Sequence, residues 1–317
     1  MSVHEPDHEP DHDGETAMPT FDTPEPIHAL IDVAGATIRI HAGERADTVV
    51  EVRPSDEFDD ADVQAARHTQ IDYAGGRLLV RLDRGGSDSG WSLSLDKLVE
   101  SPATWARSLL LGWEGSVEVT VHLPAGSRVE AKTAKGLYCH GPLGDLAFAT
   151  SYGDISVEQA GRVRLKTAHG HVSLDRAAGF AEITTTNGDI RVGTVDGPAV
   201  VKTSHGQLRI GEVTGELRLN SAYGDITVDR ARAGVAAKTA YGSVRIGEVA
   251  RGAVVMETTG GGLDLGIREG SAAWLDVSSR YGLVDVGLDS TEGPGSSEDV
   301  VEVRAHTAYG DIRIRRS

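Results

Sequence analysis

The amino-acid sequence predicts an all-β fold, a single-chain β-solenoid of about ten coils, each of roughly 17–19 residues. The first observation is a period, because a glycine preceded by Ser or Thr three positions earlier recurs ten times, most often at intervals of about 18 residues. The second is the alternation of apolar and polar residues around each glycine, which is typical of strands with one buried face. A fixed period of this length indicates stacked coils rather than one globular core. The ten anchor glycines are Gly136, Gly153, Gly170, Gly188, Gly206, Gly224, Gly242, Gly261, Gly282 and Gly310.

Each repeat contains two predicted strands joined by two turns. The second and fourth residues after an anchor glycine are aliphatic, as in Ile190 and Val192. The seventh and fifth residues before an anchor are also apolar, as in Leu217 and Leu219. These columns are expected to face inward, and the polar residues between them to face solvent. The repeats show no helical period, so no helix is predicted in them.

The turns have a chemistry of their own. An anchor glycine suits a turn position where φ is positive. A second glycine nine positions before the anchor, such as Gly197 or Gly215, marks the opposite corner. The Ser or Thr three positions before every anchor is predicted to form a structural ladder, because hydroxyls stacked ~4.8 Å apart bond to one another or to the turn backbone. The predicted structural turn ladder consists of Gly153, Gly170, Gly188, Gly206, Gly224 and Gly242.

Two other solenoids have compatible periods and do not fit. The left-handed hexapeptide helix needs an aliphatic residue at every sixth position, and the sixth and twelfth residues after Ile190 are Asp196 and Lys202. The calcium-binding nonapeptide roll needs Gly-Gly-x-Gly-x-Asp in both halves of a coil. The second half that begins at Gly197 lacks the aspartate. Both architectures are therefore excluded.

The chain divides into three segments. Residues 1–26 hold eight acidic residues and no Lys or Arg, which predicts a disordered, acidic tail rich in His and Pro. Residues 27–125 are predicted to form irregular opening coils, and residues 126–317 the regular repeats. The acidic run at 56–62 is expected to be a solvated loop, because its carboxylates lack the order of an EF-hand calcium site.

One short helical insertion is predicted near residues 93–113, and no helix outside it. Ser101 and Pro102 suit the N-cap and first positions of a helix, and Trp105, Leu109 and Trp113 recur every four residues on one stripe. A solenoid needs a cap over its first coil, so the insertion is expected to fold back over residues 27–125. The alternative is that Trp105 and Trp113 are exposed and contact a partner or, peripherally, a membrane surface.

Composition limits the partners and the location. The formal net charge is −17, and binding to nucleic acid needs clustered Lys and Arg, so no nucleic-acid partner is expected. The lone Cys139 precludes an internal disulfide and suits a reducing compartment. The N-terminus lacks the basic and apolar regions of a secretory signal, and the sequence holds no apolar run long enough to span a membrane. These features predict a cytoplasmic protein.

Three stretches together resemble a family of bacterial β-strand-repeat proteins described as putative adhesins, whose domain has no known function. They are ATIRIHAGERADTVVEVRP, GSVEVTVHLPAGSRVEAKTAKG and the repeat seen in TSYGDISV and TAYGDIRI. The resemblance covers residues 27–317, and the tryptophan-rich insertion is not part of the family pattern. It implies a β-solenoid without known catalysis and brings no catalytic residues or cofactor.

Two columns of the solenoid are candidate sites. The residues before the anchors include Tyr152, His169, His205, Tyr223 and Tyr241, a candidate ligand surface to which Trp105 and Trp113 are added. This column is either a stacking platform for a sugar or peptide, or a structural ladder at the corner of the turn. The residues after the anchors include His171 between Asp154 and Asp189, which suits acid–base chemistry or a cation, or else spaces like charges apart.

Other chemistry is weakly indicated. His4, His8 and His12 recur every four residues in the tail, and the prolines between them prevent a helix that would align the imidazoles for a metal. No G-x-S-x-G, GxxxxGK or HExxH motif is present. The sequence therefore predicts a protein that is not an enzyme and has no cofactor.

The predicted function is a binding or scaffold module with an unidentified protein or glycan partner. One alternative is a polymerising solenoid resembling the bactofilin cytoskeleton, which needs uncapped apolar ends. Against it, Arg313, Arg315 and Arg316 stud the last strand and are expected to block edge pairing. A carbohydrate-active β-helix enzyme is the remaining alternative.

Overall fold

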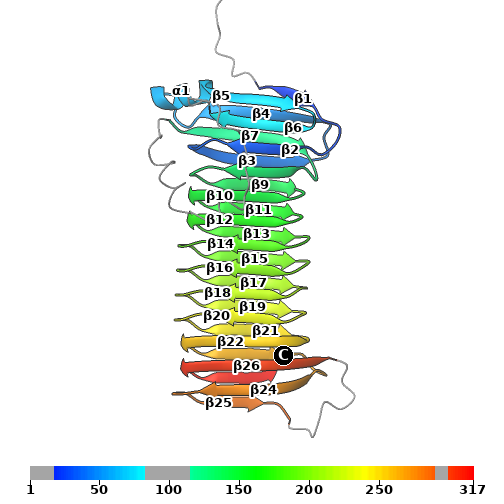
Figure 1. Cartoon of the computed structure of the whole chain (residues 1–317), viewed down its shortest axis with the longest axis vertical. Helices are drawn as coiled ribbons and strands as arrows, with labels where there is room; N and C mark the ends of the chain where they lie inside the picture. Colours follow the sequence, from blue (N-terminus) through cyan, green and yellow to red (C-terminus); the bar gives the residue numbers. More distant parts are fainter. Residues whose placement is uncertain (1–17, 83–114, 290–298) are drawn as a thin grey trace, which may run out of the picture.

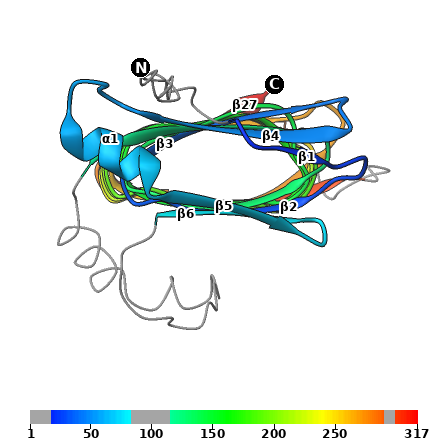
Figure 2. The ribbon, with the colours of Figure 1, turned by 90° about the horizontal axis from the view of Figure 1, so that it is seen from above.

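The chain forms a rod of two facing β-sheets in a computed structural model that describes residues 18–82, 115–289 and 299–317 (Figure 1). One sheet has 14 strands and the other 13, and each coil gives one strand to each sheet. The chain runs along one sheet, turns, and returns along the other, so that the two sheets enclose one narrow core (Figure 2). The predicted β-solenoid is therefore confirmed.

Each sheet is a single stack of strands along the rod. In stacking order, the first sheet contains β1 (Thr20–Asp22), β4 (Asp47–Pro54), β7 (Val117–Pro124), β3 (Ala36–Gly43), β9 (Leu137–Pro142), β11 (Ile155–Ala160), β13 (Val172–Ala177), β15 (Ile190–Val195), β17 (Leu208–Val213), β19 (Ile226–Ala231), β21 (Val244–Val249), β23 (Leu263–Ile267), β27 (Ile312–Arg316) and β25 (Val284–Gly287). The second sheet contains β24 (Ala272–Ser279), β26 (Val300–Tyr309), β22 (Gly252–Gly260), β20 (Val235–Lys238), β18 (Leu217–Asn220), β16 (Ala199–Lys202), β14 (Ala181–Thr184), β12 (Val163–His169), β10 (Leu146–Tyr152), β8 (Arg128–Lys132), β2 (His28–Asp32), β6 (Arg77–Leu82) and β5 (Thr69–Ala74).

Neighbouring rungs in the regular part pair in parallel, residue for residue. Val172 pairs with Ile190, Ile190 with Leu208 and Leu208 with Ile226, so one position of the repeat forms one column. The side chains of Ile190 and Ile226 are 1% and 0% exposed. The predicted inward columns are confirmed, because a parallel stack in fixed register buries the same repeat position on every rung.

The anchor glycines lie where neighbouring turns touch. The six glycines of the predicted turn ladder have φ between 128° and 150°, whereas Gly136 and Gly282 do not have positive φ. A Cβ added at Gly188 would lie 2.0 Å from the carbonyl oxygen of Gly170 on the preceding rung. Only glycine permits both this backbone conformation and this close approach of turns.

The hydroxyl column holds the turns together through the backbone. Thr258 and Thr307 donate their side-chain hydroxyls to the anchor carbonyls of Gly242 and Gly261 on the preceding rung, both at 3.0 Å. Thr185 makes the same contact to Gly170 at 3.4 Å. The predicted hydroxyl ladder is therefore present, and most of its hydroxyls bond to backbone carbonyls, whereas those of Thr167 and Ser221 are buried without a hydrogen-bond partner.

The N-terminal end of the rod is closed by elements that the sequence analysis did not predict. Helix α1 (Asp60–Arg67) begins within the acidic run expected to be a loop, so the expectation of no helix outside the insertion is wrong. Asp59 caps the helix by accepting a hydrogen bond from Ala61 N, and Asp60 and Asp62 lie in its first turn, where the helix dipole favours negative charge. Residues 20–22, placed in the disordered tail by the sequence, form β1.

The strands at this end also change direction. β4 pairs antiparallel with β7, β1 pairs antiparallel with β4, and β5 pairs antiparallel with β6. Phe21 on β1 and Tyr73 on β5 bring their ring centroids to 5.1 Å, which joins the two sheets across the end. Phe21, Ile71 and Tyr73 pack against the core and cover it at the N-terminal end, and α1 lies at one side of this end (Figure 2).

The C-terminal end departs from the order of the sequence. β26 lies between β22 and β24, and β27 lies between β23 and β25, so the last coil of the chain is inserted before the preceding one. The strand with Arg313, Arg315 and Arg316 is therefore an inner strand, and the prediction that these residues block the edge is wrong. The terminal coil is β24 and β25 (Figure 1).

The predicted helical insertion at 93–113 lies outside the described residues, and so do Trp105 and Trp113. Its expected role as a cap stays a prediction. Among the residues that the structure describes, no helix has the length and apolar character needed to cross a membrane.

Candidate functional site

The residues that precede the anchor glycines form one ladder along an edge of the rod. The rings of Tyr152 and His169 stack at 5.2 Å between centroids and 8° between planes. His205 and Tyr223 stack at 5.0 Å and 9°, and Tyr223 and Tyr241 at 5.4 Å and 7°. The structure thus brings together all five residues that the sequence assigned to this surface within the repeats.

Asn187 links the two halves of the ladder. Its side-chain amide donates to His169 Nδ1 at 3.1 Å, and its backbone bridges to both His169 and His205. The tyrosines of the ladder stay exposed, with Tyr152, Tyr223 and Tyr241 at 52%, 51% and 56%. From Tyr152 to Tyr241 the ladder is therefore a continuous and accessible surface.

The stacking decides which part of each ring is available. Because neighbouring rings are nearly parallel, each ring turns its faces toward the rungs on either side. A ligand that lies along the edge contacts ring edges, phenol hydroxyls and imidazole nitrogens. The predicted use of the whole column as a stacking platform would need free ring faces, and inside the ladder the faces are occupied by neighbouring rings.

The ladder is interrupted at Gly260, where no side chain occupies the position before the anchor. Gly260 bridges to Tyr241 on one side and is in register with Tyr309 on the other. Tyr309 in turn stacks on Tyr281 at 5.1 Å. Tyr241 and Tyr309 therefore belong to rungs on either side of an empty ladder position, about 9.6 Å apart at two rung spacings.

The surroundings of this gap are polar. A hollow of about 370 Å³ is lined by the residues that immediately precede Gly260 and Tyr309 and by their neighbours. Lys238 and Glu257 form an ion pair of 2.8 Å in this lining. His306 Nδ1 lies 2.8 Å from the Ser278 hydroxyl, and Thr259 is exposed beside the gap. The full lining is Lys238, Thr239, Glu257, Thr258, Thr259, His306, Thr307 and Ala308.

The column that follows the anchors has a structural task. Asp154 Oδ1 accepts a hydrogen bond from His171 N at 2.8 Å, and His171 Nδ1 accepts one from Asp189 N at 3.0 Å. Asp189 accepts from Gln207 N, and Asp225 from Ser243 N, both at 2.8 Å. Each side chain thus binds the backbone of the next rung, and His171 is engaged by the backbone and does not pair with the two carboxylates.

A second imidazole stack was not predicted. His41 lies between His122 and His140 on β3, β7 and β9, with ring centroids at 4.8 and 5.4 Å. Partial burial lowers the pKa of His41 below its ordinary value, and the two neighbouring imidazoles lower the pKa further. No local pattern in the sequence points to this cluster, because its three strands are distant in the chain. β7 comes after β3 in the sequence, yet in the sheet β3 lies between β7 and β9.

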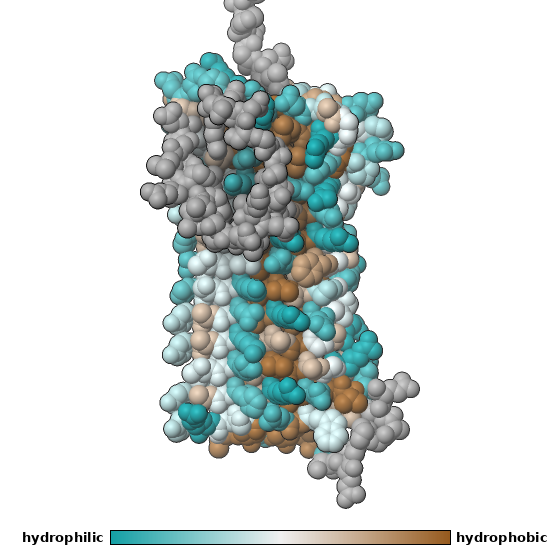
Figure 3. All heavy atoms as spheres, viewed as in Figure 1, coloured by the Kyte–Doolittle hydropathy of each residue, from teal (hydrophilic) through white to brown (hydrophobic). Residues whose placement is uncertain are grey.

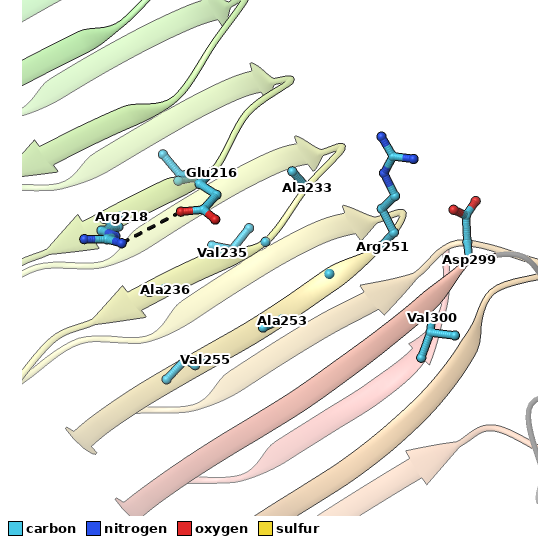
Figure 4. Close-up of a pocket in the computed structure, with 13 residues that line it drawn as sticks. Glu216, Arg218, Ala233, Val235, Ala236, Arg251, Ala253, Val255, Asp299 and Val300 are labelled. Carbon is cyan, nitrogen blue, oxygen red and sulfur yellow. Dashed lines mark ion pairs between the residues drawn. The ribbon is translucent and has the colours of Figure 1, made fainter.

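The largest hollows elsewhere lie on the sheet faces. One of about 580 Å³ covers β18, β20 and β22 (Figure 4). Its floor is made of small residues such as Ala236 and Ala253, and Glu216 is paired with Arg218 at 3.8 Å at one side. Arg251 and Asp299 lie at the other side and point outward (Figure 4). No pair of carboxylates or nucleophile and base converges on this hollow.

Metal and thiol chemistry find no support in the described part of the chain. No group of three His, Cys, Asp or Glu side chains there is arranged to hold a metal ion. His4, His8 and His12 lie outside the described residues. Cys139 is buried, and this burial raises the pKa of its thiol, which keeps it in the unreactive protonated form.

Comparison with known proteins identifies the family. No curated protein matches the chain. Among solved structures, the chain is similar to a putative adhesin from Bacteroides fragilis, with a TM-score of 0.39 and 10% identity over 94% of this chain and 96% of that one. It is also similar to a putative adhesin from Parabacteroides merdae, with a TM-score of 0.38 and 13% identity over 80% and 97% of the two chains.

A third similar structure is a putative cell adhesion protein from Clostridium sporogenes, with a TM-score of 0.24 and 12% identity over 96% of this chain and all of that one. The sequence model of the Toastrack DUF4097 family, a domain of unknown function, matches residues 29–253. This match begins in β2 and ends at the start of β22, so it includes α1 and most of the regular coils and leaves out β1. The protein with this capped and laddered solenoid therefore belongs to the Toastrack DUF4097 family.

Proposed function

We propose that the protein is a non-enzymatic binding module that holds a neutral saccharide ring at the gap in its aromatic ladder. The observation that carries the proposal is the missing ring at Gly260 between Tyr241 and Tyr309. A ring placed on the Gly260 rung would lie one rung spacing, ~4.8 Å, from the backbone of each neighbouring tyrosine, and rings stack at such separations. This spacing is close to the 5.0–5.4 Å that the ladder itself uses. The Tyr241 ring, whose Cδ1 lies 3.2 Å from a Cβ built at Gly260, would shift to admit it.

The polar lining favours a saccharide over an apolar side chain. Seven of the eight residues that line the adjacent hollow carry a hydroxyl, a charge or an imidazole. Thr239, Thr258 and Thr307 already donate to turn carbonyls. The exposed Lys238 and Thr259, together with Glu257 and His306, remain as polar groups that suit sugar hydroxyls better than an apolar side chain. The formal net charge of −17 disfavours an anionic ligand, so the saccharide is neutral.

The absence of catalysis rests on how the candidate residues are used. His171, the residue best placed for acid–base chemistry by the sequence, receives one backbone hydrogen bond on its imidazole and lies beside a carboxylate that is itself occupied. No described carboxylate near the gap is paired with a second one, since Glu257 is paired with Lys238. The surface can therefore bind and position a ring without cleaving it.

The experiment is a titration of the full chain with neutral hexasaccharides of β-linked glucose, β-linked N-acetylglucosamine and α-linked glucose, followed by calorimetry and saturation-transfer NMR. The decisive variant is Gly260→Tyr, which supplies the missing ring from the protein. Gly260 does not have positive φ, and its new Cβ would lie 3.2 Å from Tyr241 Cδ1, a contact that a small ring movement relieves. We expect wild-type protein to bind one of these saccharides and Gly260→Tyr to have lost the binding.

Asn187→Tyr is the matched control, because it adds a tyrosine at the same repeat position four rungs away. It is expected to fold and to bind as the wild type does. Failure of all three saccharides to bind, or equal binding by Gly260→Tyr, would contradict the proposal. Binding that is lost in Asn187→Tyr and kept in Gly260→Tyr would place the ligand on the ladder away from the gap.

A further inference from the structure

The terminal coil of the rod leaves a strand edge unpaired in both sheets. β24 is hydrogen-bonded to β26 alone and β25 to β27 alone among the described strands, so each has one free edge. Both strands lie at the C-terminal end of the rod, one in each sheet (Figure 1). Two free edges, held side by side by one coil, form a template for further strands.

The same coil exposes apolar side chains at repeat positions that are buried in the inner rungs. Val284 and Val286 are in register with the buried Ile312 and Ile314, yet they are 45% and 41% exposed. Leu275 on β24, in register with the buried Val303, is 38% exposed. Apolar surface gathers along this end of the rod (Figure 3). The apolar core is therefore exposed to solvent at this end of the rod.

The usual protections of an edge strand are missing from this coil. Neither β24 nor β25 contains Lys, Arg or Pro, and both pair with their inner neighbours without a bulge. Their charged residues, Asp276 and Asp285, lie 3.7 Å from His306 and Arg313 on those inner neighbours. The opposite end differs, because antiparallel strands, α1 and the Phe21–Tyr73 contact close it.

The occupant of such an end must satisfy two requirements at once. It must offer a strand to each sheet at the separation that one coil sets, and it must bring apolar side chains to the cut core. Residues 290–298, which follow β25 in the chain, consist of Ser, Thr, Glu, Gly and one Pro, and this sequence offers no large apolar side chain to meet the second requirement. A second copy of the terminal coil meets both.

We propose that two copies of the chain associate through their C-terminal coils, related by a two-fold axis perpendicular to the rod. Such an axis places the strands of the two copies antiparallel, which is the favourable arrangement for joining edges directly. A two-fold interface uses the same patch on both copies. Because the N-terminal ends are closed, the assembly stops at a dimer and does not grow into a filament.

The test is sedimentation velocity of the full chain over a wide range of concentrations. In Val286→Lys and Leu275→Glu, the new charge reaches water in a single copy and is buried without a partner in the dimer. Each is expected to raise the dissociation constant of the dimer by at least about tenfold. Val200→Lys is the matched control, since Val200 faces outward on the inner strand β16, and it is expected to dimerise normally.

Circular dichroism and thermal melting of dilute samples establish that each variant is folded. A wild-type protein that is monomeric at every concentration would overturn the proposal. So would dimers that persist unchanged in both Val286→Lys and Leu275→Glu, because the contact would then lie elsewhere. Species larger than a dimer would contradict the two-fold arrangement, because the N-terminal end would then also be open to association.

Discussion

At the scale of single residues, the anchor glycines are the most constrained positions in the molecule. Each has a backbone conformation or a close neighbour that a side chain would disturb, and at Gly188 both conditions hold. The carbonyl that approaches Gly188 belongs to Gly170 and also accepts the hydroxyl of Thr185. A side chain at this glycine would therefore displace a carbonyl on which the hydroxyl ladder also depends.

Gly188→Ala is expected to lower the free energy of unfolding by about 1–3 kcal/mol or more, through strain at positive φ and the clash of its Cβ with Gly170. Urea denaturation followed by circular dichroism measures the loss. Gly43→Ala is the matched control, because a Cβ at Gly43 meets nothing within 4 Å. Equal stability of the two variants would mean that the turns can separate without cost.

At the scale of elements, the strands β7, β3 and β9 carry the three stacked imidazoles of His122, His41 and His140. Strand register places the Cα atoms of the three residues opposite one another, so the imidazoles stay neighbours as long as the strands are paired. Protonation of His41 places a charge in a partly buried position between two other titratable rings. We therefore expect this cluster to make the N-terminal half of the rod sensitive to acid.

A pH dependence of stability follows from the lowered pKa of His41, and the lowered pKa of the partly buried His28 adds to it. The unfolded chain takes up the proton near pH 6.5, and the folded chain only at a lower pH, so between these values the unfolded state binds more protons. Stability is therefore full above about pH 6.5 and falls as the pH decreases below it. Denaturant titrations across this range measure the slope.

His41→Asn is expected to reduce this pH dependence, because it removes the titrating group from the centre of the stack, while His28 keeps its own contribution. His171→Asn, which changes an imidazole that hydrogen-bonds to the backbone outside this stack, serves as the control and keeps the slope. A slope that is the same in the wild type and in His41→Asn would assign the acid sensitivity to other groups.

At the scale of the whole molecule, the two ends of the rod are different. The N-terminal end finishes in antiparallel strands, a helix and an aromatic contact between the sheets, whereas the C-terminal end finishes in a parallel coil with a cut core. Further strands can therefore pair with the solenoid only at its C-terminal end. The closure depends on β1, a strand of three residues.

Removal of residues 1–26 deletes β1 and with it Phe21, which exposes the edge of β4 and the ring of Tyr73. We expect the truncated protein to form species larger than the wild type does, increasing with concentration, because a second end becomes available for strand pairing. Light scattering coupled to size-exclusion chromatography detects them. Removal of residues 1–17 alone, which leaves β1 in place, is the control and is expected to behave as the wild type.

The sequence predicted those features that depend on one repeat and its immediate neighbours. Because rungs stack in fixed register, a residue type that recurs at one repeat position becomes a column, and the inward faces, the hydroxyl ladder and the exposed Tyr–His edge all follow from that. Helix α1 also had local signals, with Asp59 at its N-cap and Arg67 in its last turn, but the acidic run as a whole suggested a loop.

Only the tertiary structure shows how the two ends of the rod are built and which contacts the residues of each column make. The long interval between Gly282 and Gly310 gives the last coil enough chain to pass the preceding one and pair with β22 and β23, a choice made by contacts between distant strands. The same choice sets Tyr309 across Gly260 from Tyr241 and leaves β24 and β25 at the open end. Sequence spacing determines which residues share a column, whereas the stacking order of distant coils depends on the free energy of packing whole strands together.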